Sequence, residues 1–358
     1  MQGDSITESQ SGSDIILTID PTIQGEAEEI LEKLIEKHKA TGGSVIVAEP
    51  KTGKILGMAN APDFDPNTYS KSAIGTFLNP AVEAVYEPGS IIKVLTMAAG
   101  IDAGKITPET KYYDTGSITL NGKTISNWDL ASAGPHGWQT MADVIDDSIN
   151  TGAVFAERQM GSAIFSKYFH AFGLNSLTNI MLPGEIKGNL NNLKNGKNID
   201  YATASYGQGI SVTPLELVSA ISAIANGGTL MRPYITLDEK PQVVGRVMSE
   251  ATAKKVTDMM VSAVFKNKLA VIQGYTIAAK TGTAFVPNFG GKGYTNDVIN
   301  SYVGFGPTAD PKFIILLKLD KPEGSPLAGQ TVVPAFHELA QYIINYLNIA
   351  PDNLNPKS

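Results

Sequence analysis

Apolar residues after Asp20 recur at spacings of three and four, as on one face of an amphipathic helix: Ile23, Ala27, Ile30, Leu31, Leu34 and Ile35. Asp20 suits the N-cap position, and Pro21 suits the first turn of a helix. The pattern therefore predicts a helix that starts at Pro21 and ends near Gly42.

Two β-rich runs follow this helix, at Ser44–Ala48 and Ile55–Ala59. The turn signal Pro50–Gly53 lies between them. We expect a hairpin that packs against the first helix.

The middle of the chain is dominated by helical spacing. Residues Thr107–Trp138 are an exception, because their Gly, Asn, Thr and Tyr content predicts short strands and loops. Helices are expected at or next to Ser90 and over Met141–Asp147, Thr151–Met160, Leu215–Ala225 and Ser249–Val264.

Strand-like runs return near the C-terminus, and a helix over Val333–Leu347 closes the pattern. There are three such runs, and their sequence suggests a meander: Tyr275–Val286, Val298–Phe305 and Phe313–Leu319. The order of elements predicts the α/β class, of the α+β type. An antiparallel sheet of about five strands would be covered by N- and C-terminal helices and carry an inserted, mainly helical lobe.

The same order predicts domain boundaries. Polar tails or linkers are expected at residues 1–13 and 351–358, around one domain at 14–350. Within it, the sheet would come from 14–62 and 270–350, and the lobe from about 63–269.

Composition narrows the function classes. Lys plus Arg number 28 and Asp plus Glu 35, so the net charge is −7, which disfavours a nucleic-acid partner. The absence of cysteine excludes disulfides, thiolate metal sites and cysteine nucleophiles, and none of the four histidines has metal-ligand spacing. No run approaches the about 18 to 20 apolar residues of a membrane span, and the polar N-terminus lacks the apolar core of a signal peptide.

Ser90 and Lys93 lie one helical turn apart, within hydrogen-bonding reach. A serine hydroxyl needs a base to become a nucleophile, and a lysine can be that base if burial and the helix dipole lower its pKa. The alternative is that Ser90 is an N-cap and Lys93 a solvated charge, because Ser-x-x-Lys alone is a weak signal.

Two further motifs also have ordinary explanations when taken alone. Ser148-Ile149-Asn150 falls between two predicted helices, where Ser and Asn commonly cap and turn. Lys280-Thr281-Gly282-Thr283 suits an edge strand that binds a peptide carboxylate, or one that a lysine protects from aggregation. A glycine inside a strand indicates a bulge or a close backbone approach.

The conjunction changes the interpretation. Ser-x-x-Lys, Ser-x-Asn and Lys-Thr-Gly occur here in the order that is the signature of penicillin-binding proteins and class A β-lactamases. From Ile15 to about Leu347 the chain resembles the transpeptidase domain of class B penicillin-binding proteins. The stretches that carry the resemblance are Leu17-Thr-Ile-Asp20 with Gln24, Tyr86-Glu-Pro-Gly-Ser90, Tyr206-Gly-Gln-Gly-Ile-Ser-Val-Thr-Pro-Leu215 and Tyr302-Val-Gly-Phe305.

The resemblance implies a peptidoglycan D,D-transpeptidase with its site between sheet and lobe. Ser90 would attack the D-Ala-D-Ala bond of a stem peptide, Lys93 would be its base, and Ser148 would relay protons. Asn150 would hold Lys93 and a substrate carbonyl. Lys280 would set a positive potential. Thr281 and Thr283 would bind the substrate carboxylate, and Gly282 would leave room for its backbone. The N–H groups of Ser90 and Thr283 would form the oxyanion hole.

The resemblance also implies partners and a location. Stem peptides and β-lactams would bind, and other cell-wall synthesis proteins would contact regions of a parent protein missing here. That parent would be anchored at the extracytoplasmic face of the bacterial cell membrane. No metal and no cofactor is expected. Ile149 and Ala279 depart from the usual motif residues, and neither removes a polar group.

Two alternatives remain open. In a serine β-lactamase, a glutamate activates water to hydrolyse the acyl-enzyme, and Glu185 with Asn189 stands where a class A enzyme has such a pair. However, Leu182-Pro-Gly-Glu185 resembles a class B penicillin-binding protein stretch in which this Glu is structural. A β-lactam-sensing receptor would acylate without useful turnover. Trp128, His136 and Trp138 are expected mainly to pack the lobe.

Overall fold

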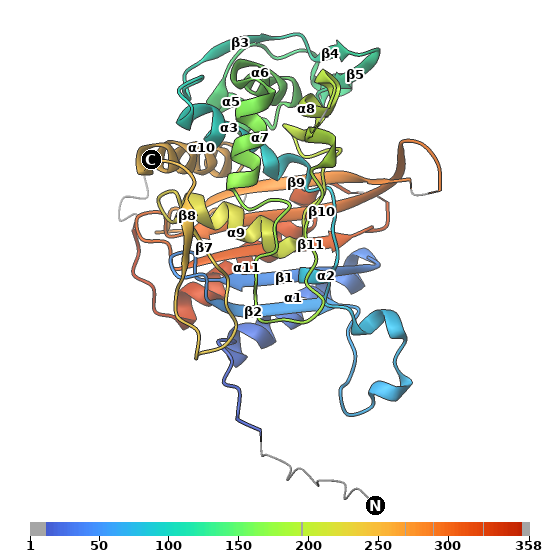
Figure 1. Ribbon diagram of the computed structural model, residues 1–358, viewed down its shortest axis with the longest axis vertical. Coiled ribbons are helices and arrows are strands. Elements are labelled where there is room, and N and C mark those ends of the chain that lie inside the picture. Colours follow the sequence, from blue (N-terminus) through green and yellow to red (C-terminus); the bar gives the residue numbers. More distant parts are fainter. Residues whose placement is uncertain (1–11, 195, 269, 289, 325, 353–358) are drawn as a thin grey trace, which may run out of the picture.

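The computed structural model describes residues 12–194, 196–268, 270–288, 290–324 and 326–352 (Figure 1). Its centre is a five-stranded sheet of order β2-β1-β11-β10-β9, antiparallel throughout. The strands come from both ends of the chain: β1 (Gly42–Ala48), β2 (Ile55–Ala61), β9 (Ala278–Pro287), β10 (Tyr294–Gly306) and β11 (Phe313–Asp320). The predicted fold class is confirmed.

Helices α1 (Pro21–His38) and α11 (Val332–Tyr346) cover one face of the sheet. Strand β1 has both of its faces covered. Val45 and Val47 pack with these helices, whereas Ile46 packs into the core shared with the lobe. Alternate side chains of a strand point to opposite faces. With both faces covered, all seven residues of β1 are buried.

Helix α1 begins as predicted and ends earlier than predicted. The Asp20 carboxylate accepts hydrogen bonds from the N–H groups of Thr22 (2.9 Å) and Ile23 (3.1 Å). The helix ends at His38, and Lys39 takes the left-handed conformation that closes it. Gly42 instead opens β1, where a β-carbon would lie 2.6 Å from the Ala61 carbonyl oxygen.

Most of the lobe lies above the sheet in Figure 1, whereas its helix α9 (Pro214–Ala225) lies level with the sheet and packs against the face opposite α1. Its helices are α2 (Pro80–Glu83), α3 (Ile92–Asp102), α4 (Leu130–Ala133), α5 (Met141–Asp146), α6 (Asn150–Met160), α7 (Ser162–Ala171), α8 (Asn198–Ala204), α9 (Pro214–Ala225) and α10 (Glu250–Asn267). The short strands form three two-stranded sheets: β3 (Lys111–Asp114) with β6 (Gly137–Thr140), β4 (Ser117–Leu120) with β5 (Lys123–Ser126), and β7 (Thr229–Met231) with β8 (Val243–Arg246). The last pair was not predicted from the sequence.

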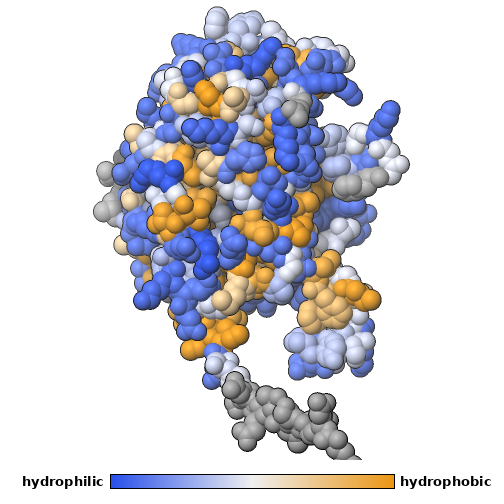
Figure 2. Space-filling model, in the orientation of Figure 1, coloured by the Kyte–Doolittle hydropathy of each residue, from blue (hydrophilic) through white to orange (hydrophobic). Residues whose placement is uncertain are grey.

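Between β2 and α2 the chain projects from the body and carries exposed apolar side chains, visible as orange atoms in Figure 2. It contains only the 3₁₀ turns Tyr69–Lys71 and Ile74–Phe77. Other 3₁₀ turns are Gly89–Ile91, Asn191–Leu193 and Ala328–Gln330.

Across the described residues, no helix combines the length and apolar character needed to cross a membrane. The predicted tail at residues 1–13 lies outside the described residues except for its last two positions. Residues 353–358 of the C-terminal tail also lie outside them.

Candidate active site

The turn that carries Ser90 packs directly against the edge strand β9, and glycines make this approach possible. A β-carbon at Gly282 would lie 2.5 Å from Ser301 Oγ and 2.7 Å from the Pro88 carbonyl oxygen. One at Gly207 would lie 2.0 Å from the Gly89 carbonyl oxygen. The close backbone approach expected at Gly282 is therefore confirmed. The backbone that approaches Gly282 is that of the turn before Ser90.

Ser90 lies in the 3₁₀ turn Gly89–Ile91 that leads into α3, and its hydroxyl makes no capping hydrogen bond. Its Oγ is instead 3.0 Å from Lys93 Nζ. Lys93 is fully buried, as is most of α3. The interpretation of Ser90 as an N-cap and of Lys93 as a surface charge is therefore wrong.

Ser148 joins this pair from the junction of α5 and α6. Its Oγ lies 3.1 Å from Lys93 Nζ and 3.0 Å from Lys280 Nζ. Its carbonyl oxygen also accepts a hydrogen bond from Lys93. Ser148 has φ of 56°, a left-handed conformation that costs a non-glycine residue about 1 to 2 kcal/mol. Surrounding contacts must therefore hold this turn.

The two lysines are electrostatically distinct. Burial and the positive charge of Lys280 hold the pKa of the Lys93 amine well below its usual range, although the Asp129 carboxylate opposes the shift. Burial lowers the pKa of Lys280 to about 8, and the Asp146 carboxylate opposes that shift. The arrangement therefore makes it easier for Lys93 to lose its proton, as a base must.

Strand β9 supplies the remaining predicted residues. Thr281 Oγ1 lies 3.3 Å from Lys280 Nζ, so a hydroxyl and an ammonium face the same space. Thr283 Oγ1 accepts a hydrogen bond from the Ala328 N–H at 3.1 Å, which ties β9 to the turn Ala328–Gln330. Both threonines line the cleft.

Asn150 is placed differently from the role implied for it. Its side-chain amide donates to the Ser126 carbonyl oxygen at 2.8 Å, rather than to a group of Lys93. Asn150 still lines the cleft, and its hydrogen bond connects the start of α6 to the end of β5.

These residues line a cleft of about 810 Å³ between β9 and the lobe. Its wall includes Ser90, Ser148, Asn150, Lys280, Thr281 and Thr283. Lys93 lies beneath this wall, in contact with both serines. The Ser90 hydroxyl, the buried Lys93 amine and the Lys280 amine are therefore linked by a continuous series of contacts through Ser148.

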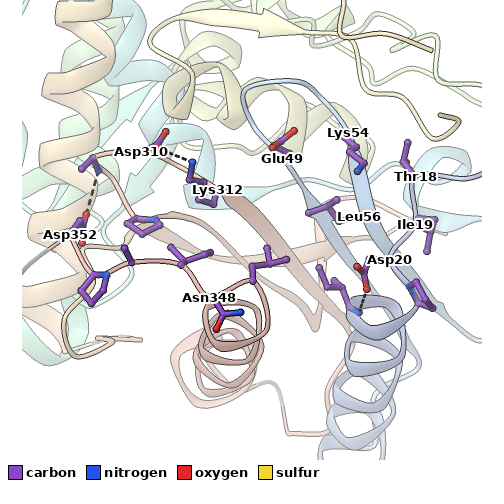
Figure 3. Close-up of a pocket in the computed structure, with 18 of the residues that line it drawn as sticks. Thr18, Ile19, Asp20, Glu49, Lys54, Leu56, Asp310, Lys312, Asn348 and Asp352 are labelled. Carbon is purple, nitrogen blue, oxygen red and sulfur yellow. Dashed lines mark hydrogen bonds and ion pairs between the residues drawn. The ribbon is translucent and has the colours of Figure 1, made fainter. Parts of the chain in front are cut away.

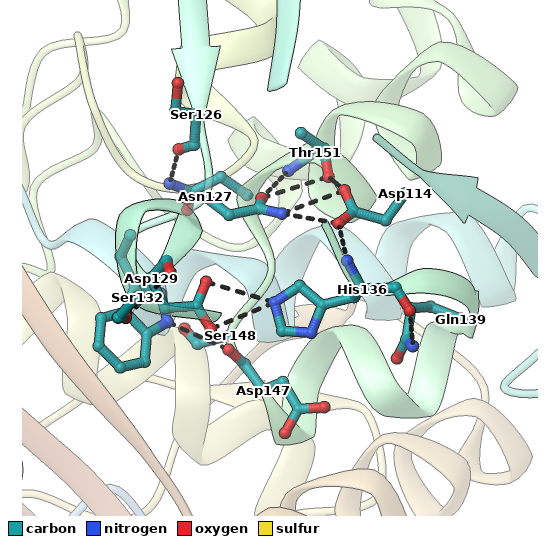
Figure 4. A network of polar contacts seen from close by, with 12 residues as sticks. Asp114, Ser126, Asn127, Asp129, Ser132, His136, Gln139, Asp147, Ser148 and Thr151 are labelled. Carbon is teal, nitrogen blue, oxygen red and sulfur yellow. Dashed lines mark hydrogen bonds and ion pairs between the residues drawn. The ribbon is translucent and has the colours of Figure 1, made fainter. Parts of the chain in front are cut away.

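A buried polar network around Asp114, which no sequence motif predicted, holds Thr151, three residues after Ser148 (Figure 4). Asp114 is fully buried and accepts hydrogen bonds from the Asn127 amide (3.0 and 3.1 Å), the His136 N–H (2.8 Å) and the Thr151 hydroxyl. Burial raises the pKa of Asp114, but these hydrogen bonds outweigh it, so the net pKa is lowered. No motif marks Asp114. Only its inward position in an alternating strand could have indicated it.

On the other side of the Ser148 turn, Trp128 Nε1 donates to the Asp147 carbonyl oxygen at 3.2 Å. Trp128 and His136 line the cleft, so they do more than pack the lobe. Trp138 does not line the cleft and makes an edge contact with Tyr113.

Glu185 and Asn189 do not form a hydrolytic pair. The Glu185 carboxylate accepts from the N–H groups of Thr178 (2.7 Å) and Asn179 (3.0 Å), which closes a local loop. Asn189 Oδ1 accepts from the Asn191 N–H at 2.8 Å. Neither residue lines the cleft.

A second cavity, of about 900 Å³, lies where the N-terminal entry to α1 meets the C-terminal segment (Figure 3). Asp20 caps α1, Asp310 pairs with Lys312, and Asp352 accepts from the Thr276 N–H at 2.7 Å. These acidic groups already have structural partners. Nowhere in the described part of the chain do three or more His, Asp or Glu residues gather so that they could hold a metal.

Comparison with known proteins adds to this geometry. A family model described as "Penicillin binding protein transpeptidase domain" matches residues 43–341. Stage V sporulation protein D of Bacillus subtilis is 34% identical over 347 residues, covering 92% of this chain and 53% of that protein. Peptidoglycan D,D-transpeptidase FtsI of Escherichia coli is 30% identical over 355 residues, covering 98% and 59%. The chain thus spans little more than half the length of these two relatives.

Solved structures are also similar. The transpeptidase domain of penicillin-binding protein 3 from Burkholderia pseudomallei superposes with a TM-score of 0.82 at 30% identity, covering 96% of this chain and 99% of that one. Penicillin-binding protein 3 from Mycobacterium tuberculosis, complexed with aztreonam, gives a TM-score of 0.86 at 28% identity, covering 98% and 83%.

Proposed function

The chain belongs to the penicillin-binding protein transpeptidase family, and from this premise we propose that it is a peptidoglycan D,D-transpeptidase that works through a Ser90 acyl-enzyme. The observation that carries the proposal is the continuous contact from Ser90 Oγ through Lys93 Nζ and Ser148 Oγ to Lys280 Nζ, with steps of 3.0, 3.1 and 3.0 Å.

In the first half-reaction, the neutral Lys93 amine takes the proton of the Ser90 hydroxyl as Oγ attacks the carbonyl carbon between the two terminal D-alanines. The oxyanion would accept hydrogen bonds from the N–H groups of Ser90 and Thr283. When the C–N bond breaks, the proton passes from Lys93 through Ser148 to the departing amine. D-Ala leaves, and an ester on Ser90 remains.

Lys280 orients this reaction by charge. Its ammonium attracts the terminal carboxylate of the stem peptide, which the hydroxyls of Thr281 and Thr283 would also bind. The same positive charge disfavours a proton on Lys93, so it helps to keep the base neutral.

In the second half-reaction, an amine of a neighbouring stem peptide attacks the ester carbon. Lys93 takes a proton from this amine and returns one to Ser90 Oγ as the ester bond breaks, which forms the cross-link. A β-lactam would acylate Ser90 in the same way as the donor. Transfer to water in place of the amine would make the isolated domain a D,D-carboxypeptidase.

We also propose bounds for the domain, a substrate contact for Asn150, and a location and partners for the reaction. The transpeptidase domain would span residues 14–350, with the sheet from 14–62 and 270–350 and the lobe between them. Asn150, although bonded to Ser126, would contact the substrate. The reaction would take place at the extracytoplasmic face of the cell membrane, with other cell-wall synthesis proteins as partners.

The test uses a synthetic peptide ending in D-Ala-D-Ala, with and without an added amine acceptor. Release of D-Ala together with the amide product would support the transpeptidase, and rapid hydrolysis of a penicillin would instead favour a β-lactamase. Acylation by penicillin without any peptide turnover would favour a β-lactam-sensing receptor. The local hydrogen bonds of Glu185 argue against the β-lactamase, because they occupy the carboxylate that would activate water.

A further inference from the structure

The cleft carries charges of both signs. Lys280 of β9 lines it with Lys93 beneath, and the lobe contributes three carboxylates, those of Asp129, Asp146 and Asp147. A donor carboxylate is favoured on the lysine side. An ammonium group is repelled there and favoured at the lobe wall.

Two of the three carboxylates already have a lysine nearby. Asp147 pairs with Lys266 at 2.9 Å. Asp146 accepts from the Ser262 hydroxyl at 3.1 Å and lies 3.9 Å from the same lysine. Their negative charge is therefore partly neutralised within the fold.

Asp129 differs. Among the described residues its ionisable partner is His136, whose Nε2 lies 3.2 Å from Oδ2 and 3.3 Å from Oδ1. Both Asp129 oxygens share this single ring nitrogen, and Asp129 also lines the cleft. Its side chain is 12% exposed, which limits screening by water.

Trp128 adds a second favourable element. Its side chain is 60% exposed in the cleft wall, and its Nε1 is bonded to the Asp147 carbonyl oxygen. The indole is therefore held in place with surface free, and aromatic faces attract ammonium groups. Asp129 and Trp128 both line the cleft, and a carboxylate and an indole are groups that suit an organic cation.

Asp129 and Trp128 line the same cleft as Ser90 and Ser148. We propose that Asp129, Trp128 and His136 bind the ammonium group of the acceptor stem peptide before acyl transfer. This inference rests on the proposed function and assigns a site for its second substrate.

The acceptor amine is protonated when it binds and neutral when it attacks, and this change accounts for the protons in the reaction. A primary amine is an ammonium near neutral pH, and that form binds at Asp129. It releases one proton to solvent and attacks the Ser90 ester as a neutral amine. The second proton passes through Lys93 to Ser90 Oγ, so the products are an amide and the free hydroxyl.

The experiment measures how the acyl-enzyme is partitioned. A thioester of an acyl-D-Ala donor would acylate the full chain, and either a peptide bearing a lysine side-chain amine or methanol would compete with water. For Asp129→Asn we expect amine transfer relative to hydrolysis to fall about fivefold, since a partly buried charge pair contributes about 1 kcal/mol. Transfer to methanol, which is uncharged, should stay within twofold.

Two control variants distinguish a loss of amine recognition from general damage to the enzyme. Glu109→Gln removes an exposed carboxylate of the same lobe and should change neither ratio. Asp129→Glu should restore part of the amine transfer. Equal losses toward amine and methanol, or unchanged amine transfer, would overturn the inference. Failure of the wild-type chain to be acylated would instead contradict the proposed function.

A binding measurement makes the test independent of turnover. The chain has two tryptophans, so Trp138→Phe leaves Trp128 as the single tryptophan, which can be excited apart from the tyrosines at roughly 295 nm or longer wavelength. The lysine peptide should change its emission in a saturable way, and Asp129→Asn should weaken that binding about fivefold. Binding that is unchanged by Asp129→Asn would contradict the proposed site.

Discussion

The amines of Lys93 and Lys280 lie at 3.1 and 3.0 Å from a single oxygen, the hydroxyl of Ser148. A hydroxyl oxygen has two lone pairs, so it can accept from both amines while its single O–H points to a third group. Burial and the charge of Lys280 hold the pKa of Lys93 well below its usual range, and burial lowers the pKa of Lys280 to about 8. We therefore assign Lys93 as the base and Lys280 as the cation, with Ser148 placed to accept a proton from Lys93 and donate its own to the leaving amine.

This assignment predicts a bell-shaped pH dependence for acylation by penicillin. The rate should rise with pH as Lys93 loses its proton, and fall above about pH 8 as Lys280 loses its own. The second-order acylation rate constant, measured by stopped flow across pH 5 to 10, checks this. Lys280→Arg keeps the charge and should remove the alkaline limb. If that limb persists unchanged in Lys280→Arg, another group is responsible.

Asp114 should control the geometry of the Ser148 turn. In Asp114→Asn, an amide N–H₂ would face the donors of Asn127, His136 and Thr151. We expect a loss of about 1 to 3 kcal/mol in the free energy of unfolding, from urea titration. We also expect about tenfold slower acylation at a temperature where the variant is folded, because the turn is displaced.

Asp258→Asn is the matched control for Asp114, because Asp258 forms an exposed ion pair with Lys254. It should change the unfolding free energy by about 0.5 kcal/mol or less and leave acylation unchanged. A stable Asp114→Asn variant with the wild-type acylation rate would show that Asp114 does not position Ser148.

Gly282→Ala tests the packing of β9 against the nucleophile turn. The new β-carbon would meet Ser301 Oγ and the Pro88 carbonyl oxygen at 2.5 and 2.7 Å, so the strand must move. We expect a loss of about 1 to 3 kcal/mol in thermal or urea unfolding, together with slower acylation. Gly25→Ala, in α1 with no atom within 4 Å, should instead stabilise the protein by about 0.5 to 1 kcal/mol. Equal effects of the two changes would refute the packing argument.

Local sequence patterns predicted the elements whose structure depends on local interactions. The Asp20 cap and the apolar face from Ile23 to Leu34 were sufficient for α1, and the β-rich runs were sufficient for the sheet. The end of α1 was misplaced because Gly42 is required by contact with Ala61, which is distant in sequence. The pair β7 and β8 was missed because strands of three and four residues are too short to show a strand pattern.

The site residues could be predicted from three motifs because the order of the motifs matches a family. The contacts of these residues, however, depend on the tertiary structure. The amide of Asn150 reaches Ser126, and Gly282 accommodates Pro88. Neither partner can be inferred from spacing. The network around Asp114 joins a strand, a loop and a helix start, so no local pattern marks it.

The most direct test of the account is intact-mass spectrometry of the wild-type chain and Ser90→Ala after incubation with a penicillin, followed over hours. The account predicts one stable adduct of the mass of the drug on the wild type, mapped by peptide digestion to Ser90, and none on Ser90→Ala. An adduct of equal amount on Ser90→Ala, or a wild type that never changes mass, would contradict it.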